Sequence, residues 1–335
     1  MISHNRPCFD SEEETAAVAV LRSGWVAQGP QVAAFEDEIC AFLALPAGHA
    51  VAVSSGSAAL YLALLALRAT GKKVIAPAYS CRAVLNAIKL AGATAVWTDV
   101  GVDSANLEPR LVSSAVAPIA IVAHMFGLPA ALPDENLPII VEDCAQALGA
   151  EIAGRKVGTF GKVGIFSFGA TKLMTTGGQG GMLVSCDREI VEFARKSRDY
   201  DVMPTARRRF NFQLTDLQAA IGRVQLRKLP TFLARREQIF RRYAEAGLKL
   251  LDIKNWHERP VRFRAVMRTD RAPHWQDRLA ETGVHAIVPV TANELLVERS
   301  LAPRAAWLSR HTLSLPIYPV LADDDVDRIV HLLAS

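Results

Sequence analysis

The sequence predicts an α/β fold with a mostly parallel central sheet covered by helices on both faces, followed by a smaller C-terminal α+β domain. Short apolar runs alternate with amphipathic or apolar helical patterns over the first two-thirds of the chain, and Gly, Pro or Asp bounds most of them. That alternation is typical of parallel sheets with crossover helices. The predicted strands are 50–53, 74–76, 95–98, 117–123, 139–141 and 163–168, and the predicted helices between and after them are 57–69, 83–91 and 188–198.

A long helical pattern then leads into the last third of the chain. Thr215 is a good N-cap for a helix over 215–229, and we expect Pro230 to end it before a second, charged helix over 231–246. A strand at 261–267 and helices at 273–282 and 323–333 follow. We therefore predict a large domain over 1–235 and a small one over 236–335 among the 335 residues.

Composition argues against several classes of protein. The net charge of +4 is small, and the basic residues are scattered except at 207–209 and 235–236, which is weak support for nucleic-acid binding. The five cysteines lie far apart with no C-x-x-C pair, so we expect no disulfide framework and no metal site. The N-terminus has no signal-peptide pattern, and the longest apolar run, 58–67, is too short to span a bilayer. We expect a soluble, cytoplasmic protein.

Ligands of open α/β sheets bind outside the carboxyl ends of the strands. Three segments meet that description: the small-residue turn 54–57, the segment 77–81 and Asp143. A cofactor should therefore lie among them.

Lys172 follows the predicted strand 163–168, which also delivers Ser167, and a glycine-rich stretch, 177–181, comes next. Glycines allow sharp turns and a close approach to a ligand. A lysine in a loop is usually a solvated charge. The alternative is a partly desolvated amine that forms a Schiff base, and this context makes the two interpretations comparable.

Asp143 ends an apolar run and precedes Cys144, Ala145 and Gln146. It could simply cap a following helix. Together with an amine such as Lys172, its carboxylate also fits pyridoxal phosphate (PLP), which needs an anion against its pyridine nitrogen. Gln146, one helical turn further on, could then bond the ring hydroxyl.

The turn 54–60 joins a strand to a helix through small residues. Free N–H groups at a helix N-terminus form an anion site suited to a phosphate. An ordinary N-capped helix would look the same, so the motif alone decides nothing.

Taken together, these features resemble the DegT/DnrJ/EryC1/StrS family of PLP-dependent sugar aminotransferases, of fold type I, along most of the chain. The matches occur in family order, which makes chance resemblance improbable. They are 23–25 (Ser-Gly-Trp), 29–32 (Gly-Pro-Gln-Val), 54–60, 77–79 (Pro-Ala-Tyr), 91–93 (Ala-Gly-Ala), 124–127 (His-Met-Phe-Gly), 142–150, 166–168 (Phe-Ser-Phe), 171–172, 178–181, 211 with 215–222, 313–316 and 318–319.

The resemblance implies roles at matching positions. Lys172 would be the Schiff-base lysine and proton shuttle, and Asp143 would pair with the pyridine nitrogen. The ring oxygen would meet Gln146. The phosphate would be held by Gly56, Ser57 and Ser167 of one subunit and by Asn211 of its neighbour, which implies a homodimer with shared active sites.

The sequence departs from the family pattern near the substrate side. Cys81 stands where an aromatic residue usually stacks on the PLP ring, and Gln213 stands where an arginine often follows the asparagine. Residues 169–170 are Gly-Ala in place of a more usual aromatic-Pro or His-Pro pair, and the C-terminal domain is shorter than in many members.

The resemblance implies an aminotransferase that acts on a keto-sugar, nucleotide-linked, with glutamate as amino donor. A sugar dehydratase of the same family is one alternative, although those relatives carry His at the lysine position. A non-catalytic regulatory or scaffolding protein that retains the fold is another. The expected partners are small molecules and a second copy of the chain, with no nucleic acid and no membrane.

Overall fold

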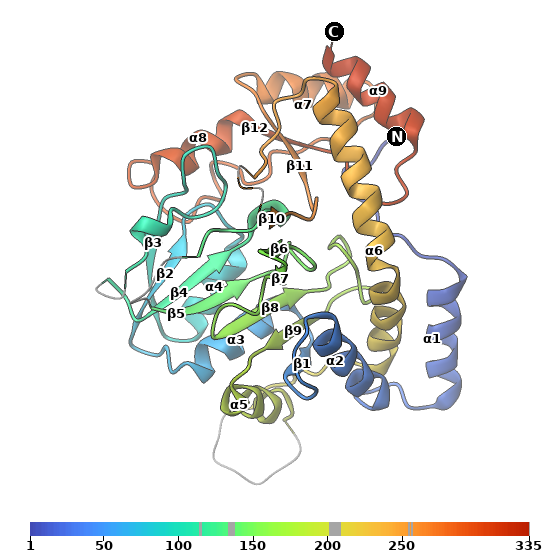
Figure 1. Cartoon of the computed structure of the whole chain (residues 1–335), viewed down its shortest axis with the longest axis vertical. Helices are drawn as coiled ribbons and strands as arrows, with labels where there is room; N and C mark the ends of the chain where they lie inside the picture. Colours follow the sequence, from blue (N-terminus) through green and yellow to red (C-terminus); the bar gives the residue numbers. More distant parts are fainter. Residues whose placement is uncertain (114–115, 133–137, 201–208, 254, 256, 335) are drawn as a thin grey trace.

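The computed structural model describes residues 1–334 except 114–115, 133–137, 201–208, 254 and 256. Its centre is a seven-stranded sheet in the order β1-β9-β8-β5-β4-β2-β3 (Figure 1). All six predicted strands of this region are present, with bounds within two residues. The strands are β1 (Ala50–Val53), β2 (Lys73–Pro77), β3 (Thr94–Thr98), β4 (Ile119–Ala123), β5 (Ile139–Asp143), β8 (Val163–Ser167) and β9 (Gly181–Val184).

Only β9 runs against the other strands of this sheet, because it pairs antiparallel with both β1 and β8. The remaining pairs, β2 with β3 and β4, β4 with β5, and β5 with β8, are parallel. The carboxyl ends of β1, β2, β4, β5 and β8 therefore meet at one edge of the sheet. The mostly parallel α/β sheet expected from the sequence is confirmed.

Helices cover both faces of the β1 side of the sheet. Side chains alternate along a strand, so Val51 and Val53 point to one face and Ala50 and Ala52 to the other. The first face packs against α3 (Gly56–Ala66), α4 (Arg82–Leu90) and α5 (Arg188–Arg198). The second packs against α2 (Pro30–Phe42) and the first half of α6 (Asp216–Glu245).

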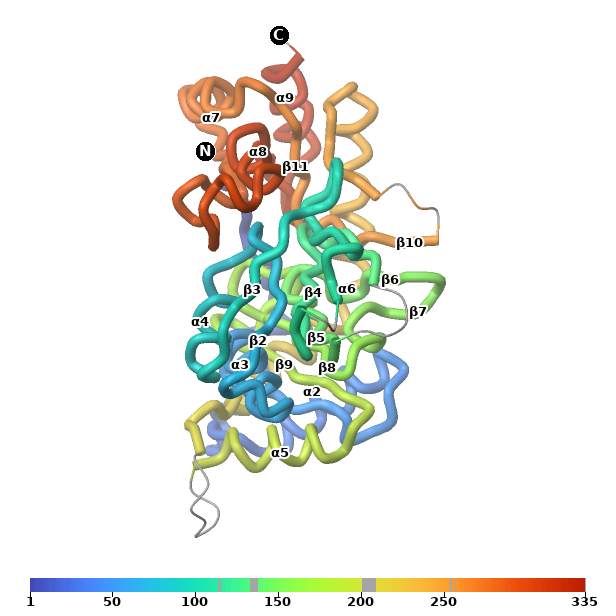
Figure 2. Tube along the Cα trace, turned by 90° about the vertical axis from the view of Figure 1, so that its left-hand side faces the viewer, coloured from blue at the N-terminus to red at the C-terminus, as the bar shows by residue number. Residues whose placement is uncertain are grey.

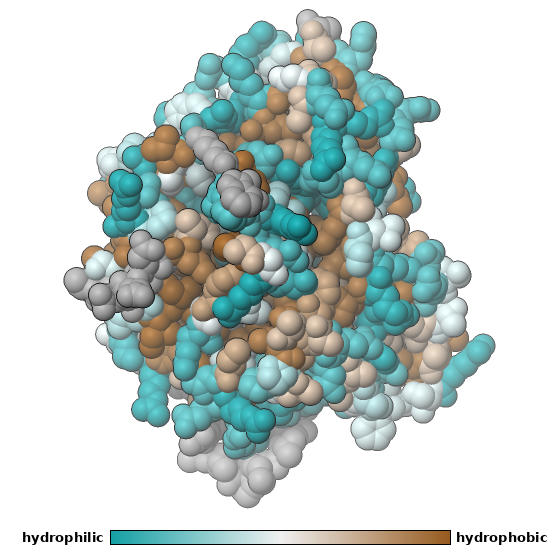
Figure 3. Space-filling view, viewed as in Figure 1, coloured by the Kyte–Doolittle hydropathy of each residue, from teal (hydrophilic) through white to brown (hydrophobic). Residues whose placement is uncertain are grey.

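The second face is covered differently over β2 and β4. Ile75, Ala120 and Val122 pack there against irregular chain around Leu107 and Val112, which includes the 3-10 turn η1 (Pro109–Leu111). Figure 3 shows apolar side chains reaching the surface on this side of the molecule.

Helix α6 corrects one expectation from the sequence. Pro230 lies inside a single helix of 30 residues and does not separate two helices. An internal proline costs about 3 kcal/mol, but Leu229 and Phe232 on either side of it are buried, and packing of this continuous apolar face outweighs the lost hydrogen bond. Thr215 is the N-cap as predicted, and with Gln218 it forms a capping box.

The sequence analysis did not predict helix α1 (Ser11–Ser23), which packs beside α6. Its buried residues are Val20 and a carboxylate: Glu13 is 3% exposed and bonds to Gln225 and Lys228 of α6. A helix held through a buried carboxylate lacks the apolar stripe by which amphipathic helices are recognised.

The C-terminal part of the chain packs on the second half of α6 (Figure 2). Its strand β11 starts four residues later than predicted, and Ile2 from the N-terminus joins its core. The domain boundary that we propose near residue 235 falls within α6. The elements are β11 (Ala265–Arg268), β12 (Thr312–Leu315), α7 (Ala272–Glu281), α8 (Pro303–His311) and α9 (Asp323–Ala334), besides a small sheet of β6 (Glu151–Ile152), β7 (Arg155–Lys156) and β10 (Glu258–Arg259).

Within the described part of the chain, no helix is both long enough and apolar enough to cross a membrane.

Candidate active site

A cavity of about 220 Å³ lies at the carboxyl edge of the sheet. Seven of the eight site residues predicted from the sequence line it: Gly56, Ser57, Cys81, Asp143, Gln146, Ser167 and Lys172. Asn211, the eighth, does not. The convergence follows from the topology, because each of these residues stands at or just beyond the end of a parallel strand.

Lys172 reaches the cavity from the connection between β8 and β9, where its backbone N–H donates to the carbonyl of Gly169 at 3.0 Å. Its Nζ lies 5.4 Å from the centre of the Phe263 ring. Among the described residues, no hydrogen bond or ion pair engages this amine. Burial lowers the pKa of Lys172, and the carboxylate of Asp143 opposes that shift. The amine is therefore closer to its neutral, nucleophilic form than a surface lysine.

Asp143 occupies the last position of β5, and its Oδ1 accepts the N–H of Ala145 at 3.0 Å. Burial raises the pKa of this carboxyl, with Ala145, Lys172 and His124 acting in the opposite direction. Residues 144–149 form turns rather than a helix, so Asp143 caps no helix. Gln146 therefore reaches the site from a turn, and the predicted spacing of one helical turn is wrong.

The carboxamide of Gln146 is held in one orientation. Its Oε1 accepts the backbone N–H of Phe126 at 2.8 Å, in the 3-10 turn η2 (Met125–Gly127). Phe126 adopts a φ of 61°, which is unusual for a bulky residue and points its N–H toward Gln146. The Nε2 group, which has no partner among the described residues, is left as a donor at the cavity.

A buried carboxylate, Glu142, holds the backbone around Asp143 in place. Its oxygens accept the N–H groups of Gly158, Phe160 and Gly161 at 2.6–2.8 Å. His124 contacts Glu142 at 3.1 Å through Nε2, while its Nδ1 accepts the N–H of Ala130 at 2.9 Å, so Nε2 is the nitrogen that donates to Glu142. Burial opposes ionisation of Glu142, but these hydrogen bonds lower its pKa overall.

The sequence analysis assigned no role to Glu142 or His124. Their side chains and that of Cys144 lie within 4.8 Å of one another, as metal ligands do. The oxygens of Glu142 are already used by four donors, so we interpret the cluster as a structural clamp. The signal available in the sequence was a charged residue inside an otherwise apolar strand.

The turn before α3 forms the far end of the cavity. Ser55 caps the helix by accepting the N–H of Ala58 at 3.1 Å, which leaves the N–H groups of Gly56 and Ser57 at the open first turn. A Cβ on Gly56 would lie 2.8 Å from Cβ of Ser167, so only glycine lets these residues approach. The arrangement is an anion site with a hydroxyl beside it.

Cys81 and Gln213 stand where the departures from the family pattern were noted. Cys81 is the exposed N-cap residue of α4 and lines the cavity without capping the helix. Gln213 does not line the cavity, and its Nε2 donates to Asp199 at 3.1 Å. Of the basic segment 207–209, residues 207 and 208 lie outside the described residues, and Arg209 donates to the carbonyl of Asp199.

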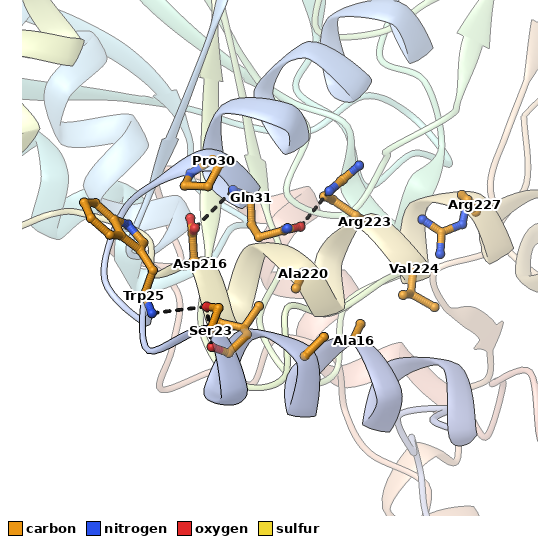
Figure 4. A pocket seen from close by; sticks show the side chains of 12 residues that line it. Ala16, Ser23, Trp25, Pro30, Gln31, Asp216, Ala220, Arg223, Val224 and Arg227 are labelled. Atoms are coloured by element: carbon orange, nitrogen blue, oxygen red, sulfur yellow. Dashed lines mark hydrogen bonds between the residues drawn. The ribbon is translucent and has the colours of Figure 1, made fainter.

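A larger cavity, of about 640 Å³, lies between α1, α2 and α6 (Figure 4). Its carboxylate, Asp216, accepts the N–H groups of Gly29, Gln31 and Val32 and so caps α2. Arg223 is bound to Glu38 and Gln31. Because these polar groups serve the packing of helices, the smaller cavity with its unpartnered amine is the better candidate for chemistry.

The model of the DegT/DnrJ/EryC1/StrS aminotransferase family matches residues 7–334. The chain belongs to this family. Among curated relatives of the family, the spore coat polysaccharide biosynthesis protein SpsC of Bacillus subtilis is 31% identical, over 98% of this chain and 95% of SpsC.

Several solved structures are closely similar to this chain. The aminotransferase TlmJ from Streptoalloteichus hindustanus is 28% identical with a TM-score of 0.90, covering 100% of this chain and 98% of its own. S. venezuelae DesV is 32% identical with a TM-score of 0.87, and the match covers 97% of this chain and 94% of the DesV chain. The fold type I assignment and the aminotransferase class are thereby confirmed for this chain.

Gly181, the first residue of β9, packs against the anion-site turn before α3 and provides a test of this packing. A Cβ on Gly181 would lie 2.3 Å from the backbone carbon of Ser55, whereas one on Gly178 of the same hairpin would meet nothing within 4 Å. We expect Gly181→Ala to lower the free energy of unfolding by at least about 2 kcal/mol, since the clash is with backbone.

The matched variant Gly178→Ala should stay within about 0.5 kcal/mol of wild type in the same urea titrations. Equal stabilities for the two variants would show that α3 does not rest on β9 as described.

Proposed function

We propose that this chain is a PLP-dependent aminotransferase that transfers an amino group from glutamate to a ketone of a nucleotide-linked sugar. The observation that supports it most is the meeting of Lys172 and Asp143, an amine and a carboxylate, in one cavity that ends at a helix N-terminus. When bound, PLP supplies an aldehyde that takes up the amino group and a ring that withdraws electrons from the reacting carbon.

The residues of the cavity fit this cofactor. The free N–H groups of Gly56 and Ser57, with the hydroxyl of Ser167, suit the phosphate. The free Nε2 of Gln146 suits the ring oxygen. Only one carboxylate oxygen of Asp143 accepts the N–H of Ala145, so the other can meet the ring nitrogen. A cationic ring nitrogen would offset the cost of the buried charge of Asp143.

Each residue then has a definite task. Asp143 holds a proton on the ring nitrogen, because an ionised carboxylate stabilises the protonated form. Lys172 accepts a proton from the substrate carbon at Nζ and returns it, which requires a neutral amine, and burial lowers its pKa toward that state. Gln146 fixes the tilt of the ring, since its own orientation is set by Phe126.

The nature of the substrate is supported by the relatives. SpsC, at 31% identity, is a spore coat polysaccharide biosynthesis protein. Cys81 is smaller than an aromatic residue and leaves room over one face of the ring, which suits a bulky sugar. Lys172 argues against the dehydratase alternative.

Five free thiols support a reducing compartment, and we propose the cytoplasm.

We also propose a homodimer with shared active sites. Asn211 is exposed and does not line the cavity of its own subunit. Its segment is nevertheless joined to the anion-site turn before α3, because the N–H of Ser54 donates to the carbonyl of Phe212 at 2.8 Å. An exposed amide beside the turn can reach the phosphate of a second copy.

The first test is covalent capture. Holoprotein should absorb visible light and lose that band on borohydride reduction, because reduction fixes the cofactor to Nζ of Lys172. Peptide mass mapping should find the adduct on Lys172. An adduct at another lysine, or no visible band at all, would overturn the proposed function and favour the non-catalytic alternative.

Asp143→Asn tests the role of the carboxylate. Asn keeps the shape and can still accept from Ala145, but it cannot hold the ring nitrogen protonated. We expect the single-turnover rate to fall on the order of a hundredfold or more, as for loss of a major electrostatic group. Asp187→Asn, at the N-cap of α5, should leave the rate unchanged. Near-wild-type turnover by Asp143→Asn would leave Asp143 a purely structural role.

Mixing two inactive variants tests the shared site. Lys172→Ala and Asn211→Ala homodimers each lack one needed group, whereas one site of the mixed dimer contains both. We therefore expect activity to return on subunit exchange, and sedimentation to show a dimer. Two differently tagged Lys172→Ala proteins, mixed in the same way, should stay inactive. No recovery despite demonstrated exchange would rule the shared site out.

A further inference from the structure

Arg264 is a partly buried arginine that lies just before β11. Its Nη1 contacts Nε2 of His4 at 3.3 Å and Oγ of Ser314 at 3.5 Å, and its guanidinium carbon lies 5.4 Å from the centre of the Phe263 ring. All of these partners are uncharged or, for His4, titratable.

No carboxylate contacts Arg264 within the described chain. The buried Arg236 likewise has none, but it donates to the backbone carbonyls of Arg262, Phe263 and Ile317. Two other arginines of low exposure are paired with carboxylates. Arg198 pairs with Glu36, and Arg262 pairs with Asp252 and Glu237. Glu294 influences Arg264 electrostatically, but its Oε2 accepts the N–H and the hydroxyl of Thr291, both at 2.8 Å. The charge of Arg264 is therefore left without a direct counter-ion.

His4 does not compensate this charge. Because a guanidinium can only donate, Nε2 of His4 must be the acceptor, so the ring is neutral and carries its proton on Nδ1. Burial and the charge of Arg264 lower the pKa of His4 to about 3. Burial also lowers the pKa of Arg264, to about 10, so it stays charged at neutral pH. A desolvated cation with neutral neighbours is a site for an anion.

This cation lies near the reactive amine. Lys172 and Arg264 both pack on the ring of Phe263, and the charge of Arg264 contributes to the lowered pKa of Lys172. The N-terminal segment joins the two: Asn5 donates to the carbonyl of Thr171 at 2.8 Å, while the preceding His4 bonds Arg264. An anion on Arg264 would thus lie near Nζ.

We infer that Arg264 binds the α-carboxylate of the amino donor, an inference that rests on the proposed aminotransferase function. In an amino acid the α-carboxylate is bonded directly to the reacting carbon, so it must lie near Nζ of Lys172. The diphosphate of a nucleotide-linked sugar is several bonds from the carbon that is aminated. A planar guanidinium also matches a carboxylate through two parallel hydrogen bonds.

The test compares wild-type holoprotein with Arg264→Met, Arg264→Lys and Arg268→Met. The last is the matched control, since Arg268 ends β11, the strand that Arg264 precedes, and pairs with Asp103. Stopped-flow absorbance follows the half-reaction with L-glutamate, and calorimetry measures the affinity of holoprotein for 2-oxoglutarate, UDP and dTDP. Thermal unfolding of each variant reports whether it is folded.

We expect Arg264→Met to lower the second-order rate constant for L-glutamate by about 100-fold, as for loss of a charge-assisted pair. The affinity for 2-oxoglutarate should fall to a similar degree. Arg264→Lys should recover only part of the rate constant for L-glutamate and of the affinity for 2-oxoglutarate, and Arg268→Met should match wild type in both. The affinities for UDP and dTDP should not change in any variant.

Unchanged glutamate kinetics in folded Arg264→Met, or a loss confined to UDP or dTDP, would overturn the inference, the second by assigning Arg264 to the sugar diphosphate. If wild type itself fails to react with glutamate, the proposed donor is wrong, and the affinity for 2-oxoglutarate alone then decides whether Arg264 is a carboxylate site.

Discussion

The geometry of the active site depends on a hydrogen-bonded carboxylate that does no chemistry there. Glu142 collects the N–H groups of Gly158, Phe160 and Gly161 together with His124, and so joins β4, β5 and the loop that leads into β8. Side chains alternate along β5, so a fixed Glu142 fixes the opposite direction for Asp143. Lys172 follows β8 a few residues later, and its distance from Asp143 is set by the same clamp.

Residues at the strand ends could be predicted from the sequence because they depend on topology alone. Once β1, β5 and β8 run in the same direction in one sheet, Gly56, Asp143 and Ser167 must share an edge. Contacts between segments far apart in sequence could not be predicted. Helix α1 is held by the buried Glu13, α6 continues through Pro230 because its packing continues, and Arg264 meets His4 only after the chain has folded.

The charges of the site explain why it stays ready for ligands. Arg264 is a desolvated cation and Lys172 a desolvated amine, both without a direct counter-ion in the described chain, while Asp143 is a desolvated carboxyl whose burial raises its pKa. Each would be better solvated in the unfolded chain, so each lowers stability until a ligand occupies the site. Strands with fully buried apolar faces, such as β1 and β4, supply the stability that tolerates them.

The segment that carries Asn211 is held by contacts that do not involve its own cavity. Arg198 is bound to Glu36 inside the protein and accepts the N–H of Phe212 on its carbonyl, while Asp199 accepts Nε2 of Gln213. The rings of Phe210 and Phe212 stack 4.9 Å apart on either side of Asn211 in the sequence. A chain that fixes this backbone so firmly while leaving the amide exposed supports the proposal that Asn211 serves a second copy, because an amide needed only for solubility would require no such framework.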